Sequence, residues 1–79
     1  MAWNETPARL EREFQFDDFR AAMAFLNRVA DVAEELGHHP EIFNVYGRVR
    51  ITLTTHDAGN VLTEKDHRLA AAIDALFED

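Results

Sequence analysis

Three histidines stand where elements of structure are expected to end, and imidazole is the side chain best suited to move protons near neutral pH. His38 and His39 are adjacent in the stretch G-H-H-P, and His56 follows two threonines in T-T-H-D. Gly37 and Pro40 are typical of a helix end, because glycine accepts the left-handed conformation and proline cannot continue a helix. Side chains at the ends of rigid elements are well placed to build a catalytic site.

Two carboxylates complete the candidate set. Glu34 precedes His38 by four residues, which is one helical turn, so it can orient that imidazole. Asp66 follows Thr63 by three residues, a variant of the capping-box spacing at a helix start. It also precedes Leu69 by three residues and therefore leans toward the apolar side of that helix.

Each of these residues also has a plainer interpretation. A histidine at a helix end can simply favour the negative end of the helix dipole, Glu34 can be a solvated helix residue, and His56 a surface residue. Three histidines and a carboxylate also suggest zinc. Adjacent histidines in a turn are poorly placed to converge on one metal, however, and no H-x-x-x-H spacing occurs. We therefore expect acid/base chemistry and no metal.

Hydrophobic periodicity predicts the elements that position these residues. Residues 10–16 alternate with period two, interrupted at Arg12, and residues 42–46 and 49–55 flank Gly47 as two further strands. Residues 1–8 show no periodicity and are interpreted as a lead-in. The strand at 48–55 carries no proline and only two charges, so we expect it to be an exposed edge that pairs with another chain.

Two amphipathic helices are predicted. In residues 19–36 the three-four spacing gives one buried stripe, and Asp17 or Asp18 offers an N-cap. That stripe is read as Phe19, Met23, Leu26, Val29 or Ala30, Ala33 and Leu36. The last helix begins after Thr63, and its stripe is read as Leu69, Ile73 and Leu76, with Ala70, Ala72 and Phe77 beside them. The order β-α-β-β-α predicts an α+β fold with both helices on one face of a small antiparallel sheet.

Length and composition set the remaining expectations. The 79 residues make a single domain (1–79), and the absence of cysteine removes disulfides as a source of stability, so self-association is expected. A net charge of −7 argues against direct binding of nucleic acid. No apolar run approaches the ~20 residues that span a bilayer, which predicts a cytoplasmic protein without a membrane partner.

Several motifs in order resemble one family. They are F-x-F-D-D-F before the first helix, E-x-x-x-H-H-P at 34–40, N-V-Y at 44–46, T-T-H-D at 54–57 and T-E-K-D at 63–66. Together they cover nearly the whole chain and resemble pterin-4a-carbinolamine dehydratase. The resemblance implies a bound pterin substrate, no cofactor, and dehydration of 4a-hydroxytetrahydropterin to quinonoid dihydropterin. It also implies a homodimer or homotetramer.

The resemblance assigns a role to each candidate. His38 is the leading general acid/base, His39 and His56 bind the pterin and assist, and Glu34 and Asp66 orient histidines or contact the ring. Members of the family also act as dimerisation partners of a transcription factor, so the alternative is a non-enzymatic interaction module. The chain departs from the family pattern at Ile42, where an aromatic is usual, and in a loop between His56 and Asp66 that is one residue longer, a difference able to displace Asp66.

Overall fold

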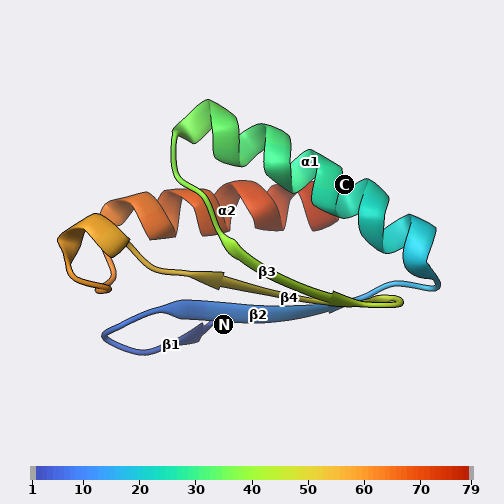
Figure 1. The fold of residues 1–79 in the computed structure, drawn as a ribbon, viewed down its shortest axis with the longest axis horizontal. Helices are drawn as coiled ribbons and strands as arrows, with labels where there is room; N and C mark the ends of the chain where they lie inside the picture. The colour runs from blue at the N-terminus through green and yellow to red at the C-terminus, as the bar shows by residue number, and fades with distance from the viewer. Residues whose placement is uncertain (1, 79) are drawn as a thin grey trace.

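A four-stranded antiparallel sheet carries two helices on one of its faces (Figure 1). The computed structural model describes residues 2–78. Its elements are β1 (Asn4–Glu5), β2 (Leu10–Gln15), α1 (Phe19–Leu36), β3 (Glu41–Val45), β4 (Arg48–Leu53), the 3-10 turn η1 (His56–Ala58) and α2 (Glu64–Glu78). The predicted α+β class and the single helical layer are confirmed, and β1 is an additional strand. Within residues 2–78, no helix is long and apolar enough to cross a membrane.

The strand order is β1-β2-β4-β3, which places β4 inside the sheet. The expectation that this strand is an exposed edge is wrong, because β2 pairs with one of its sides and β3 with the other. Gly47 makes this arrangement possible: a Cβ there would lie 2.2 Å from the carbonyl oxygen of Phe16. The Phe16 N–H donates to the Gly47 carbonyl at 2.8 Å, which holds the end of β2 against the start of β4.

Both ends of α1 follow the predicted capping residues. The carboxylate of Asp18 accepts a hydrogen bond from the Ala21 N–H at 2.8 Å, and Gly37 adopts the left-handed conformation with φ of 67°. The buried stripe, however, is centred differently from the prediction. Phe19 and Leu36 are 51% and 37% exposed. The buried residues of α1 are Ala22, Phe25, Leu26, Val29 and Ala33.

The core lies between this stripe, the inward face of the sheet and one side of α2. Alternate residues of β4 face the helices and are fully buried: Val49, Ile51 and Leu53. In α2 the predicted Leu69, Ala70 and Ile73 are buried, and Leu76 is half-buried. Through these residues α2 packs into the same core as the sheet, and this packing positions the first turn of the helix.

The segment interpreted as a lead-in is part of the core. Trp3 is 5% exposed, and its Nε1 donates to Asp74 Oδ1 of α2 at 2.8 Å. Arg12, which interrupts the alternation of β2, is paired in register with the fully buried Ile51 and therefore lies on the helix side of the sheet. Its guanidinium is 2.5 Å from the same Asp74 oxygen and lies over the ring of Phe14 at 4.4 Å. The broken pattern thus marks an ion pair at the rim of the core.

We predict that Trp3→Ala lowers the free energy of unfolding by about 3 to 5 kcal/mol, because a large buried ring and its hydrogen bond to Asp74 are both lost. Urea unfolding followed by circular dichroism measures the change. Trp3→Phe, which keeps an aromatic ring against Phe14, is the control and loses less. A Trp3→Ala protein within about 1 kcal/mol of the parent would contradict the placement of this ring in the core.

Candidate active site

The end of α1 places His38 over the sheet. The Gly37 N–H donates to the Glu34 carbonyl at 3.2 Å, and the His38 N–H donates to the Ala33 carbonyl at 3.1 Å. These two bonds satisfy carbonyls of the last helical turn, and the left-handed glycine turns the chain away from the helix axis. The His38 side chain is only 12% exposed as a result, so most of this imidazole is shielded from solvent.

Asp66 lies in the first turn of α2 and is fully buried. Its Oδ2 accepts a hydrogen bond from the Thr63 N–H at 3.0 Å, which is the reciprocal half of a capping box. The same oxygen accepts from the Thr55 hydroxyl at 2.8 Å, and the hydroxyls of Thr55 and Thr63 are 2.6 Å apart. Because Thr55 has one hydroxyl proton and gives it to Asp66, Thr63 must donate to Thr55. Asp66 is therefore held at the start of α2 by both threonines.

His38 completes the ring of donors around this carboxylate. Its Nε2 is 2.5 Å from Asp66 Oδ1. Burial raises the pKa of Asp66, but the hydrogen bonds from His38, from the Thr63 N–H and from the Thr55 hydroxyl outweigh burial, and the charge of His38 adds to them. The pKa of Asp66 is therefore lower than its ordinary value of 3.8, and the residue is an anion at neutral pH.

An ionised carboxylate can only accept hydrogen bonds, so Nε2 of His38 must carry a proton. This leaves Nδ1 as the nitrogen that can give or take a proton. No hydrogen bond within residues 2–78 occupies it. Asp66 thus fixes the orientation of the ring and the position of one proton, as carboxylates do in other histidine sites.

His39 and His56 lie at the surface, each beside a glutamate. The four-residue spacing predicted that Glu34 lies beside His38, but its Oε2 is instead 3.5 Å from His39 Nε2. His56 begins η1, beyond the last residue of β4, and its Nε2 is 3.7 Å from Glu41 Oε2. The two imidazoles are 66% and 63% exposed, which leaves both able to contact a ligand.

Asn60 holds the other side of His56. The amide oxygen of Asn60 accepts from His56 Nδ1 at 2.7 Å, and Asn60 itself has a left-handed backbone with φ of 60°. Asparagine tolerates this conformation better than most residues with a side chain. Asn60 therefore both closes the turn and orients a candidate histidine.

All three histidines line one hollow of about 190 Å³ between the end of α1 and η1. Its walls are Gly37, His38, His39, Thr55, His56, Asp57 and Lys65. Asp66 lies beneath it and Glu34 beside it, so the five candidates share one region of the molecule. Ile42 belongs to the edge strand β3 and is not part of this wall. Within residues 2–78, no three histidine, aspartate, glutamate or cysteine side chains are grouped to hold a metal ion.

Four residues that contact the candidates were not predicted as part of the site. Thr55 and Thr63 bind Asp66, while Glu41 and Asn60 lie against His56. The capping pattern gave Thr63 a structural role only. Thr55 directly precedes a candidate histidine, and Asn60 lies in the loop between two candidates, His56 and Asp66, so the sequence position of each was a signal. Glu41 carries none, because only the pairing of β3 with β4 brings it near His56.

Comparison with known sequences identifies one family. The family model described as "Pterin 4 alpha carbinolamine dehydratase" matches residues 1–76. A protein of Acidobacterium capsulatum named "Putative pterin-4-alpha-carbinolamine dehydratase" is 56% identical over 76 residues, which are 96% of this chain and 82% of that protein. A protein of Gloeobacter violaceus named "Putative pterin-4-alpha-carbinolamine dehydratase 2" is 58% identical over 64 residues, covering 81% of this chain and 68% of its own.

Two solved structures share the fold. A transcriptional coactivator/pterin dehydratase from Brucella melitensis superposes with a TM-score of 0.87 and 40% identity, over 95% of this chain and 81% of that chain. A pterin dehydratase-like protein identified as a RuBisCO assembly factor in the alpha-carboxysome superposes with a TM-score of 0.73 and 33% identity, over 94% of this chain and 84% of that chain. Proteins with this fold thus carry names from more than one functional class.

The lowered pKa of Asp66 predicts a specific loss of stability in acid. A carboxyl group whose pKa is lower in the folded chain stabilises the fold above its unfolded pKa, and this contribution is lost as the pH falls through the folded value. Asp66→Asn should therefore be less stable than the parent at about pH 5, and the gap should narrow toward about pH 3. Urea unfolding of both proteins across this range measures it, and a gap that stays constant would contradict the prediction.

Proposed function

The chain belongs to the pterin-4a-carbinolamine dehydratase family, and from this premise we propose that it removes water from 4a-hydroxytetrahydropterin to give quinonoid dihydropterin. The observation that carries the proposal is the pair formed by His38 and the buried, ionised Asp66 at the base of the histidine-lined hollow. A half-open hollow with oriented proton carriers suits a reaction that consists of two proton transfers.

The chemistry of a carbinolamine defines what the site must do. Its hydroxyl and its nitrogen are bonded to the same carbon. When water leaves, the carbon–oxygen bond breaks, the oxygen takes a proton from an acid, and the nitrogen loses its own proton to a base as the carbon–nitrogen double bond forms. No electrons are gained or lost overall, so proton transfer and positioning are sufficient.

We assign the roles by environment. His38 has its Nε2 proton held by Asp66, and its Nδ1 is the general acid/base. His39 and His56 are exposed on the wall of the hollow and bind the pterin, and either can take the second proton. Glu34 orients His39, and Asp66 orients His38. Glu41 Oε2 lies 3.7 Å from His56 Nε2, on the side of the ring opposite the contact with Asn60.

A non-enzymatic interaction module is the alternative, since the solved relatives include a transcriptional coactivator/pterin dehydratase and a RuBisCO assembly factor. The buried carboxylate favours the enzyme. A charge at a fully buried position costs stability unless several donors surround it, and a binding surface elsewhere on the molecule does not require one. An ionised Asp66 beneath His38 suits an enzyme, because it holds the proton on Nε2 while Nδ1 can exchange another.

We predict that His38→Gln lowers the dehydration rate by roughly 100- to 10,000-fold, the usual contribution of a general acid/base. Glutamine is chosen over alanine because its amide nitrogen can still donate to the buried Asp66, so the fold is preserved. The appearance of quinonoid dihydropterin, followed by absorbance, measures the rate.

His67→Gln is the matched control. His67 is exposed on α2 and does not line the hollow, so this variant should keep the parent rate. Circular dichroism and urea unfolding establish that both variants are folded. A folded His38→Gln protein that dehydrates the carbinolamine at the parent rate would refute the assignment of His38.

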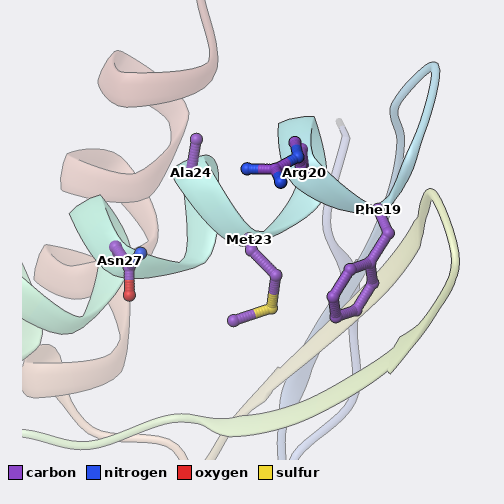
Figure 2. A pocket seen from close by; sticks show the side chains of 5 residues that line it. All are labelled: Phe19, Arg20, Met23, Ala24 and Asn27. Carbon is purple, nitrogen blue, oxygen red and sulfur yellow. The ribbon is translucent and has the colours of Figure 1, made fainter.

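We further propose that the chain forms a homodimer or homotetramer through β3. This strand is an edge of the sheet and contains no proline and one charge. Ile42, Val45 and Tyr46 are 46%, 57% and 65% exposed. A hollow of about 500 Å³ lies on α1, and Figure 2 shows Phe19 and Met23 pointing from that helix toward the strands. A second copy would cover both apolar areas and pair the free edge.

Two measurements test this assembly. For the parent protein, dilution should lower the melting temperature, because association and folding are linked by mass action. Val45→Lys places a charge on the proposed interface and should shift the protein toward the monomer in sedimentation velocity. Val61→Lys makes the same change at a valine 43% exposed in the loop after η1 and should not. A parent protein that is monomeric at micromolar concentration would contradict the proposal.

A further inference from the structure

A second, larger groove adjoins the histidine-lined hollow. Its volume is about 510 Å³, and its walls are Thr55, Asp57, Ala58, Thr63, Glu64, Lys65 and Arg68. Thr55, Asp57 and Lys65 are walls of both spaces, so the two form one surface that runs from the histidines along the start of α2. A ligand bound among the histidines has this groove as its continuation.

The volumes indicate which part of a ligand enters the groove. Small-molecule sites usually enclose about 300 to 1,000 Å³. The histidine-lined hollow, at about 190 Å³, is smaller than this range, whereas the hollow and the groove together fall within it. A substrate whose reacting ring lies against the histidines must therefore extend a ring substituent past Lys65.

Lys65 is the single lysine of the chain. Its side chain is exposed, and within residues 2–78 it makes no hydrogen bond or ion pair. Lysine side chains carry much rotational freedom, and its loss on pairing with an anion reduces the net gain from that contact. An unpaired ammonium on the wall that separates the two spaces is thus available to a ligand.

The other charges of the groove indicate where along it an anion would bind. Asp57 lines both spaces from η1 and repels an anion on that side, whereas Lys65 and Arg68 line the groove from α2. Arg68 lies three residues after Lys65, on the same side of α2, and its guanidinium is 3.2 Å from Glu64. Because Glu64 pairs with Arg68, Lys65 is the cation left for an anion, which is expected on the α2 side of the groove, away from Asp57.

We propose that Lys65 is a specificity residue for an anionic group, a phosphate or a carboxylate, on the substituent of the pterin ring. The inference rests on the proposed function, because it takes the ring to lie against His38, His39 and His56. A neutral substituent would still fit the groove, but it would not use the ammonium. The chain therefore prefers pterins with anionic substituents over neutral ones of the same shape.

A matched pair of stable ligands tests the preference: 6-hydroxymethyl-7,8-dihydropterin and its monophosphate ester, which differ by one phosphate. Isothermal titration calorimetry on the full chain measures both affinities. The parent should bind the ester about five- to tenfold more tightly, since one contact between charges near a surface contributes about 1 kcal/mol. Added salt should reduce the preference, because exposed charges are screened.

Lys65→Gln should reduce the preference to less than about twofold while leaving the affinity for the neutral ligand nearly unchanged. Arg20→Gln is the control, because it removes the same charge from an exposed residue on the separate hollow of α1 and should keep the preference. Equal affinity of the parent for both ligands, or an equal loss for both in Lys65→Gln, would overturn the inference but leave the pterin site standing. A parent that binds neither ligand would overturn the proposed function as well.

Discussion

A buried carboxylate needs hydrogen bonds in place of the water it has lost, and this requirement organises one end of the molecule. The donors to Asp66 come from three separate places: the turn after α1, the end of β4 and the start of α2. Each donor also fixes the element that carries it. The same charge that would otherwise destabilise the core therefore holds the ends of these elements together and sets the orientation of His38.

The other end of the molecule is held by aromatic packing. Phe14, Phe16, Phe25 and Phe77 form contacts with ring centroids between 4.9 and 5.9 Å apart, in tilted or edge-to-face arrangements. Arg12 closes this cluster by stacking on Phe14 and pairing with Asp74. Because this packing stabilises the fold at one end, the polar end can carry an open hollow and exposed imidazoles.

Sequence patterns were sufficient for the features that depend on neighbours along the chain. The helix bounds follow from Asp18 and Gly37, and the burial of Asp66 follows from its spacing to Leu69. Features that depend on pairing across the fold were not predictable in this way. The inner position of β4 depends on which strands reach it, and alternation of buried residues is the same for an edge and an inner strand with one wet face.

The carboxylates beside His38 and His39 were also not predictable from spacing along the chain. A helical spacing of four places Glu34 near residue 38 only if the helix continues to that residue. Gly37 ends α1 first, and the turn directs His38 inward to Asp66 while His39 stays outside beside Glu34. Trp3 was missed for a related reason: its two partners, Phe14 and Asp74, lie on different elements, and no local pattern connects them.

The loop between His56 and Asp66 shows what determines the position of a candidate site residue. The loop alone does not set the place of Asp66. Asp66 instead takes its position from α2, which is fixed by buried Leu69 and Ile73, and from the donors Thr55 and Thr63. The loop itself turns at the left-handed Asn60, whose side chain binds His56. The contact between His38 and Asp66 thus depends on packing and hydrogen bonds at element ends, while the loop between them and His56 serves mainly to orient His56.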